Sequence, residues 1–518
     1  MLERCRSGRA GRSGDGRNYM YSLLHRDIHS ASSRRTRHIW TVFAMVATVA
    51  ALALLAFAAG ASARSIRPGP HSTFESCDLW DYGYQCENEI SHNWGQYSPY
   101  FSVPSKISPD VPEHCTVNFV QILSRHGARN PTSSKVEAYQ ALMEKIFANA
   151  TRLPGKYAFL EYYRYDYGAD QLTPFGQEEM FNSGRKFYHR YPELARQHTP
   201  FVRSSGGDRV VMSAQNWTFG YHSAKVYIDD NRPDPDWQYP IRVIPEDDGV
   251  NNTLNHGLCT AFENGPDSDI ASAAQAQWAA IFVPPIQARL NTDLPGVDLT
   301  IPETIYLMDL CAFDTVAHPD GTVSPFCHLF TPPEFEQYSY FETLNKYYGY
   351  GYGNPLGPTQ GVGWTNELIA RLTGEPVDDH TSSNRTLDGN ETTFPLGAKI
   401  YADFSHDNDM TSIFFAMGLY ADTPALSNTS MMGLTETGGY SAAVTVPFAA
   451  RMYVERMSCG DEKYWGKNDM VRVLVNDRVV VPPRCWSDEY GMCTVLDFVK
   501  SLGWAARGGR WRDCDMEL

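Results

Sequence analysis

An apolar segment near the N-terminus constrains this chain most, because it decides the compartment in which the remaining residues fold. Residues 39–59 carry no charged side chain and follow Arg34, Arg35 and Arg37. Their 21 residues have the length of a membrane span with basic charge on its cytoplasmic side. They equally fit the apolar region of a signal peptide, since a small-residue cleavage pattern follows at residues 61–63. Either interpretation places residues 64–518 outside the cytosol.

The basic segment before it, residues 1–38, leaves both interpretations open. It is long for the front of a signal peptide, so either translation begins at Met20 or residues 39–59 form an uncleaved signal anchor. We expect cleavage and therefore a secreted, extracellular protein. The membrane is a partner only if residues 39–59 stay attached as an anchor.

The cysteine count agrees with export. Cys5 precedes the apolar segment, and an even ten of the 11 cysteines follow it. An even number in an oxidising compartment predicts five disulfides, although spacing alone does not choose among the pairings. Asn-x-Ser/Thr sequons further predict a glycoprotein; they begin at Asn149, Asn216, Asn251, Asn384, Asn390 and Asn428.

The charge balance excludes one class of partner. The formal net charge is −16, but the first 38 residues hold nine Arg against three acidic residues. Residues 64–518 therefore carry 35 basic and 57 acidic side chains, a formal charge of −22. A chain this acidic gives no support to nucleic-acid binding.

Strand and helix patterns alternate near both ends of the exported part, and the middle is mainly helical. Strands are predicted at 116–124, 210–213, 241–244 and 399–404, with a hairpin at 471–481. This order favours an α/β fold with a helical cap. The predicted parts are a basic segment (1–38), a signal peptide or anchor (39–63), an α/β domain in three parts (64–135, 200–258 and 395–518) and a helical cap in two (136–199 and 259–394).

Two of the predicted strands run directly into clusters of ionisable residues. The first strand continues as Arg125-His-Gly-Ala-Arg-Asn-Pro131. Paired guanidiniums suit a phosphate, because each engages two of its oxygens, and an imidazole between them can attack phosphorus. The other cluster, Ser405-His-Asp-Asn-Asp409, lies at a strand-to-helix junction, where helix N–H groups favour an anion. Each alone would fit a surface turn or a helix cap, but together they predict a phosphate-handling catalytic site.

In this order the two motifs resemble the histidine acid phosphatases. Further stretches resemble the secreted fungal phytase branch: 201–209, 251–257, 307–309, 324–327, 346–349, 353–358, 401–410 and 471–480. The similarity runs from about Ser76 to Cys514. It implies a central mixed sheet flanked by helices, with a smaller helical cap domain. It also implies an acid phosphomonoesterase that hydrolyses phytate (myo-inositol hexakisphosphate) and other phosphomonoesters through a phosphohistidine intermediate.

The resemblance assigns roles to individual residues. His126 is the nucleophile, and Asp407 is the general acid, which is neutral most readily in acidic solution. The phosphoryl group is held by Arg125, Arg129, Arg203 and His406, and the rest of the substrate by Lys135 and Lys346. Because arginines supply the positive charge, we expect no metal and no cofactor. The expected partner is a small-molecule phosphomonoester, and the expected oligomeric state is a monomer.

The resemblance also implies the disulfide pairing. The expected bonds are Cys77–Cys86, Cys115–Cys459, Cys259–Cys514, Cys311–Cys327 and Cys485–Cys493.

Three alternatives to a phytase stay open. Ala138 and Asn345 stand where some members carry a further Lys, which would suit a broad-specificity acid phosphatase with little preference for phytate. A non-catalytic phosphoinositol-binding glycoprotein is disfavoured, because the heptad and the His406-Asp407 pair are intact. A metal-dependent hydrolase is disfavoured as well, because no His-x-x-x-His or similar ligand spacing accompanies the two motifs.

Overall fold

The computed structural model describes residues 76–229, 234–235, 237–460 and 469–515. The predicted basic segment and the predicted signal peptide or anchor lie outside these residues. Within the described ranges, none of the helices has both the length and the apolar character that a membrane span requires.

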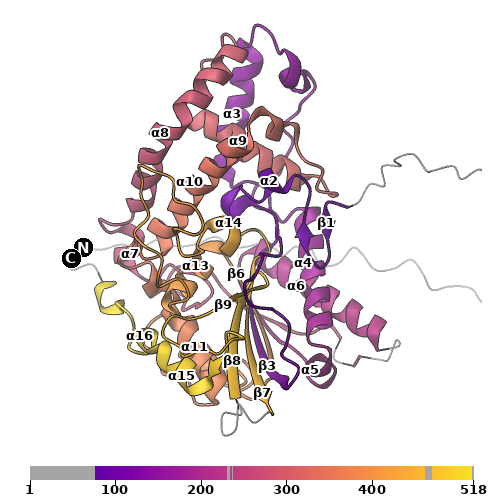
Figure 1. Ribbon diagram of the computed structural model, residues 1–518, viewed down its shortest axis with the longest axis vertical. Coiled ribbons are helices and arrows are strands. Elements are labelled where there is room, and N and C mark those ends of the chain that lie inside the picture. The colour runs from indigo at the N-terminus through magenta and orange to yellow at the C-terminus, as the bar shows by residue number, and fades with distance from the viewer. Residues whose placement is uncertain (1–75, 230–233, 236, 461–468, 516–518) are drawn as a thin grey trace, which may run out of the picture. The chain divides into compact units, whose positions relative to one another are not determined.

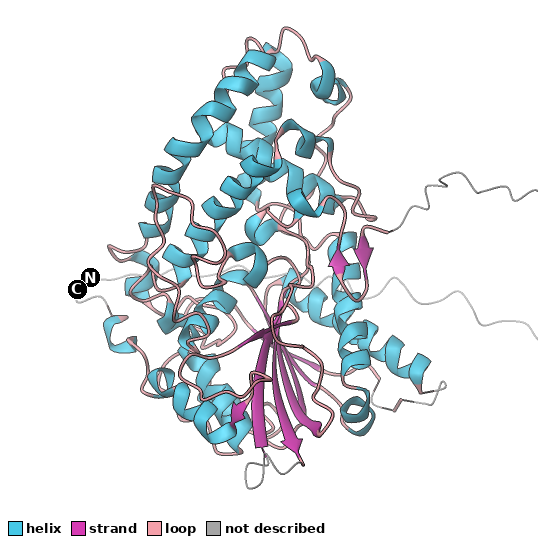
Figure 2. Ribbon diagram, in the orientation of Figure 1, coloured by secondary structure: helices cyan, strands magenta, loops and turns pink. Residues whose placement is uncertain are grey.

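A mixed sheet forms the framework (Figure 2). Its strands lie in the order β10-β8-β7-β3-β6-β4-β5, with β9 paired to β8. The central strand β3 pairs in parallel with β6 and antiparallel with β7. The strands are β3 (Cys115–Arg125), β4 (Phe201–Ser205), β5 (Ile241–Ile244), β6 (Ile400–Ser405), β7 (Arg451–Cys459), β8 (Asp469–Val475), β9 (Arg478–Val480) and β10 (Cys493–Thr494), and a separate pair is β1 (Asp78–Leu79) with β2 (Gly83–Tyr84).

Helices cover both faces of this sheet (Figure 1). Val120 and Ile122 of β3 point into one cluster with α4 (Pro174–Arg190), α5 (Pro192–Gln197) and α6 (Asp208–Ile228). Phe119 and Leu123 point the opposite way, because side chains alternate along a strand. On that face lie α11 (Val362–Thr373), α13 (Asp407–Ala416), α15 (Val495–Ser501) and α16 (Gly503–Ala506). The sheet with helices on both sides confirms the predicted fold class.

A second group of helices, which we call the helical group, lies beyond one end of the sheet (Figure 1). It contains α3 (Ser133–Asn149), α8 (Ile270–Asp293), α9 (Ile301–Ala317) and α10 (Pro332–Tyr350). The short elements are α2 (Asn88–Ser91), α7 (Thr260–Asn264), α12 (Arg385–Asp388), α14 (Ala442–Thr445) and the 3₁₀ turns η1 (Gly95–Tyr97), η2 (Gly155–Glu161), η3 (Pro325–Leu329), η4 (Pro358–Gly361) and η6 (Trp511–Asp513).

Two predictions about the elements need correction. Residues 210–213 are not a strand but part of α6. The buried positions Val210, Ala214, Trp217 and Tyr221 follow helical spacing, which outweighs the strand preference of the Val-Val pair. Three helices from the ranges predicted as helical cap pack on the sheet instead. They are α4 and α5, from residues 136–199, and α11, from residues 259–394.

The structure contains all five disulfides that the resemblance implies. They join Cys77 to Cys86, Cys115 to Cys459, Cys259 to Cys514, Cys311 to Cys327 and Cys485 to Cys493.

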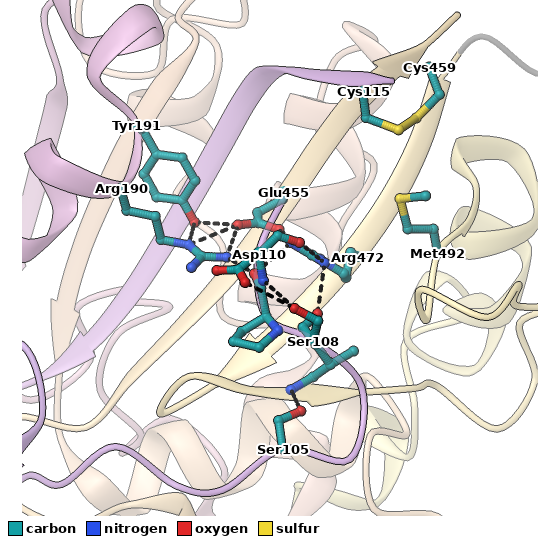
Figure 3. A network of polar contacts seen from close by, with 12 residues as sticks. Ser105, Ser108, Asp110, Cys115, Arg190, Tyr191, Glu455, Cys459, Arg472 and Met492 are labelled. Atoms are coloured by element: carbon teal, nitrogen blue, oxygen red, sulfur yellow. Dashed lines mark hydrogen bonds and ion pairs between the residues drawn. A yellow bond between two sulfur atoms is a disulfide. The ribbon is translucent and has the colours of Figure 1, made fainter. Parts of the chain in front are cut away.

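A buried ionic network fastens the segment before β3 to the sheet (Figure 3). Glu455 of β7 is fully buried, and its Oε1 accepts hydrogen bonds from Arg190 Nη2 at 2.9 Å and from Tyr191 Oη at 2.6 Å. Its Oε2 accepts one from Arg472 Nε at 2.9 Å. The other guanidinium nitrogens of Arg472 donate to the carbonyl oxygens of Pro109 and Asp110. One carboxylate therefore supplies the counter-charge of the fully buried Arg472 and of the partly buried Arg190.

We expect Glu455→Ala to lower the free energy of unfolding by about 3–5 kcal/mol, because the fully buried Arg472 and the partly buried Arg190 would lose their shared counter-charge. Urea unfolding measures the loss. The matched control is Glu193→Ala, which removes a carboxylate 77% exposed in its ion pair with Arg196 and should change stability by less than about 0.5 kcal/mol. If Glu455→Ala loses no more stability than Glu193→Ala, Glu455 does not balance the two arginines as described.

Candidate active site

Strand register brings the two ionisable motifs to one edge of the sheet. Arg125 at the end of β3 lies opposite Ser405 at the end of β6, because these strands are parallel and in register. The residues that follow, His126 and His406, have ring centres 5.6 Å apart. In open α/β sheets, ligands bind beyond the carboxyl ends of parallel strands, so this edge is the place to expect a site.

A cavity of about 680 Å³ opens at this edge. On the sheet side it is lined by residues of the loops that follow the strands, among them His126, Arg129 and His406. On the opposite side it is lined by residues of α3, α8, α9 and α10. The cavity therefore lies between the sheet and the helical group.

His126 presents one ring nitrogen to the cavity in a form that can attack. Its Nδ1 lies 2.8 Å from the carbonyl oxygen of Gly127, which can only accept, so Nδ1 carries the proton and Nε2 keeps its lone pair. Burial, followed by the nearby charges of Arg125, Arg209, His406 and Arg129, holds the pKa of His126 well below its usual value. The imidazole consequently stays neutral in mildly acidic solution.

Guanidinium groups with unused donors surround this imidazole. Arg125 is fully buried. Its Nη1 donates to the carbonyl oxygens of Gln96 and Val446, and its Cζ lies 4.5 Å from the centre of the Phe448 ring. Among the described residues, nothing accepts a hydrogen bond from Nε or Nη2 of Arg125, or from Nε of Arg129 and of Arg209. Arg129 and Arg209 line the cavity, and Arg125 lies directly before His126. Buried donors without acceptors are costly, so these groups mark a site for an anion.

His406 is oriented by a carboxylate. Its Nε2 lies 2.9 Å from Oε1 of Glu246, which also accepts from Ser205 Oγ at 2.5 Å and from the Gly207 N–H at 2.9 Å. Burial opposes the ionised form of Glu246, but these hydrogen bonds outweigh it and hold the pKa of Glu246 at about 2. Glu246 therefore stays ionised beside His406 in acidic solution.

Asp407 begins α13 and lies between two cations. Its Oδ2 is 2.6 Å from Lys346 Nζ, and its Oδ1 is 3.4 Å from Arg125 Nη2. Although burial favours the neutral carboxyl, Arg125 and Lys346 hold the pKa of Asp407 well below its usual value. The free protein thus carries Asp407 as a carboxylate in acidic solution, whereas the sequence led us to expect a neutral acid there.

The two predicted substrate-binding lysines both line the cavity, and each already faces a carboxylate. Lys346 pairs with Asp407, and Lys135 Nζ lies 2.6 Å from Oδ2 of the buried Asp309. Ala138 does not line the cavity, but Asn345 does.

Two predicted phosphate-binding residues, Arg125 and Arg203, are absent from the lining of the cavity. Arg125 directly precedes His126, which lines the cavity, whereas Arg203 is held elsewhere. It lies in the middle of β4, 2% exposed, with its Nε 2.8 Å from Asp403 Oδ1 and its Nη2 2.5 Å from Glu367 Oε2. Two buried carboxylates thus hold Nε and Nη2 of this guanidinium within the core, and Arg203 does not line the cavity. Its role in the structure is to link β4 to β6 and α11.

Arg209 and Glu246 line the cavity and were missed from the sequence. Arg209 belongs to the first turn of α6, just after β4, and Glu246 follows the end of β5 by two residues. The available signal was position relative to the strand ends, because residues beyond the carboxyl end of a parallel strand reach the site whereas residues within the strand do not. Within the described ranges, no group of three or more His, Cys, Asp or Glu side chains could hold a metal ion.

Comparison with known proteins fits this arrangement. Residues 116–476 match the histidine phosphatase superfamily (branch 2). The chain belongs to this superfamily. It is 54% identical to Phytase A of Aspergillus oryzae over 446 residues, covering 85% of this chain and 94% of that protein. It is likewise 54% identical to Phytase A of Emericella nidulans over 445 residues, with the same coverage.

Two solved structures are similar to this chain in fold. The phytase from D. castellii is 26% identical with a TM-score of 0.65, covering 80% of this chain and 85% of that one. The multiple inositol polyphosphate phosphatase of Bifidobacterium longum, in complex with inositol hexasulfate, is similar in fold alone, with 15% identity, a TM-score of 0.58 and coverage of 79% and 97%. Superfamily and relatives together identify this chain as a phosphoric monoester hydrolase with a small-molecule phosphate ester as substrate.

Proposed function

We propose that this protein is a secreted acid phytase, which hydrolyses phytate and other phosphomonoesters through a phosphohistidine intermediate. The proposal rests on the unprotonated Nε2 of His126 and on the three guanidinium groups near it. Arg125, Arg129 and Arg209 each keep at least one N–H donor without a hydrogen-bond acceptor among the described residues. Positive charge supplied by arginine and fixed in advance suits a transferring phosphoryl group, whose transition state spreads negative charge over three oxygens.

The reaction proceeds in two displacements at phosphorus. His126 Nε2 attacks the phosphorus, a P–N bond forms, and the P–O bond to the alcohol breaks while the departing oxygen takes a proton by way of Asp407. A water molecule then attacks the phosphohistidine, which releases inorganic phosphate and restores the imidazole. Arg125, Arg129 and Arg209 hold the phosphoryl oxygens throughout, together with His406.

The size and far wall of the cavity favour a substrate with several phosphates. A cavity of about 680 Å³ is larger than one phosphate group needs, and two lysines, Lys135 and Lys346, face it from the helical side. Phytase A, the name of the fungal relatives, fits such a substrate.

We infer export and glycosylation from the sequence features together with the disulfides. Asn390 is exposed and open to modification. Asn149 is exposed as well, although its side-chain nitrogen donates to the carbonyl oxygen of Lys145 at 2.8 Å. The side-chain nitrogen of Asn251 instead donates to the carbonyl oxygens of Thr381 and Ser383, so a glycan at Asn251 requires that these bonds break. A monomer remains our expectation for the oligomeric state.

The test compares kcat/KM for phytate and for 4-nitrophenyl phosphate, at about pH 5 with a chelator present, using the full chain expressed with export. Efficient turnover of phytate supports the proposal. Turnover of the simple ester alone would make the protein a broad-specificity acid phosphatase. Binding without product release would favour a phosphoinositol-binding glycoprotein, and activity lost to the chelator would favour a metal-dependent hydrolase.

A further inference from the structure

A buried carboxyl group in the cavity wall takes no part in the proposed reaction. Glu342 of α10 is 4% exposed and lines the cavity. Its Oε2 accepts a hydrogen bond from Gln96 Nε2 at 2.5 Å. A Cβ on the neighbouring Gly95 would lie 2.3 Å from the Cβ of Glu342, so α10 and η1 pack tightly here and fix the position of the side chain.

The charged groups that act on Glu342 belong to the helices α3, α9 and α10. Lys135 of α3 and Asp309 of α9 form an ion pair of 2.6 Å, and Lys346 of α10 pairs with Asp407 at the same distance. Tyr97 of η1 and Tyr338 of α10 complete the surroundings. Both lysines are thus already paired with other carboxylates, so an ionised Glu342 adds a third negative charge beside two positive ones.

The charge of Glu342 changes in neutral solution. Burial raises its pKa to about 7, with Asp309 acting in the same direction and Lys135, Lys346 and the Gln96 hydrogen bond opposing. Below pH 7 the group is protonated and neutral. As the pH rises through 7, this wall of the cavity becomes more negative by one unit.

We propose that Glu342 is a specificity-determining residue that confines the binding of highly anionic substrates to acidic solution. When Glu342 is neutral, phosphates on the helical side can draw Lys135 and Lys346 from their carboxylates. When it is ionised, the same phosphates meet a buried negative charge and are repelled. This inference rests on the proposed function, because it requires that a polyanionic ester fill the cavity.

The test measures binding of inositol hexasulfate by titration calorimetry between pH 5 and 8 for the wild type and Glu342→Gln. Sulfate esters stay fully ionised over this range, so any pH dependence of Kd comes from the protein. We expect similar Kd values at pH 5 and about tenfold tighter binding by the variant at pH 8, because its wall stays neutral. If Glu342→Gln folds poorly, Glu342→Met removes the same charge and should show the same Kd values at pH 5 and pH 8.

The control is Glu336→Gln, which removes an exposed carboxylate from the same helix outside the cavity and should follow the wild-type curve. Parallel curves of Kd against pH for the wild type and Glu342→Gln would overturn the inference while leaving the proposed function intact. Failure of the wild type to bind hexasulfate even at pH 5 would overturn both.

Discussion

Replacing His126 with alanine is expected to lower kcat for every phosphomonoester by at least about 10⁴-fold. The reason is geometric: Nε2 of His126 faces the cavity among the unused donors of Arg125, Arg129 and Arg209, so it is the atom placed for attack on a bound phosphorus. The assay is steady-state hydrolysis of 4-nitrophenyl phosphate and of phytate. Rapid acid-free quenching of the wild type should also trap phosphate on a histidine, and the variant should trap none.

The same variant should keep its affinity for inorganic phosphate. The guanidiniums that hold the anion remain, so added phosphate should still raise the Tm of His126→Ala. The pKa of His126 lies well below its usual value, so the imidazole is neutral in mildly acidic solution. Protonation of the nucleophile should therefore not reduce wild-type activity at about pH 5.

The matched control is His328→Ala, which removes a histidine 56% exposed and away from the cavity. It should retain full activity. Residual turnover by His126→Ala above about one part in a hundred would contradict covalent catalysis at this residue, because an intact anion site alone accounts for only a small part of the rate.

Those site residues that come directly after a predicted strand could be identified from the sequence. The heptad after β3 and the His406-Asp407 pair after β6 could be predicted to meet, since both strands are buried and precede ionisable clusters. Arg203 and Arg209 were harder, because both lie in one short segment and only the end of β4 at Ser205 decides which of them reaches the cavity. The prediction of a strand at 210–213 was wrong because Val210 and Val211 are both β-branched, which favours a strand when the helix around them is not recognised.

Contacts between distant segments lay beyond prediction from single-sequence patterns. The charge of Glu455 in β7 is balanced by Arg190 of α4 and Arg472 of β8. These residues are far apart in the sequence, so no pattern of neighbouring residues predicts the network. The disulfide pairing was available only through the resemblance, since spacing alone allows many pairings. The ionisation of Asp407 also depends on a distant residue, Lys346, 61 positions earlier in the chain.

That ionisation alters how the leaving group must obtain its proton. In the free protein Asp407 is a carboxylate held by Lys346 and Arg125, so it brings no proton of its own in acidic solution. A phosphate monoester, whose second pKa is about 6, carries one proton below that pH. We expect Asp407 to accept this proton from the bound phosphate and pass it to the oxygen of the departing alcohol. Activity should then fall as the pH rises through about 6 and the substrate loses that proton.

Asp407→Asn is therefore expected to separate substrates by their leaving groups. An amide cannot relay the proton, so kcat/KM for an inositol phosphate, whose alkoxide leaves poorly, should fall by about 10³–10⁴-fold. For 4-nitrophenyl phosphate, whose leaving group needs no proton, the loss should stay within about tenfold. The ratio kcat/KM is the proper measure, because it reports the step that breaks the P–O bond.

The variant also frees Lys346 from its 2.6 Å ion pair, so binding of a polyanionic ester should tighten even as its turnover falls. A lower KM with a much lower kcat would distinguish this outcome from general damage to the site, which raises KM. Asp422→Asn, an exposed replacement of the same kind outside the cavity, should change neither constant. Equal losses on both substrates would remove Asp407 from the proton path and leave it the role of positioning Lys346 and Arg125.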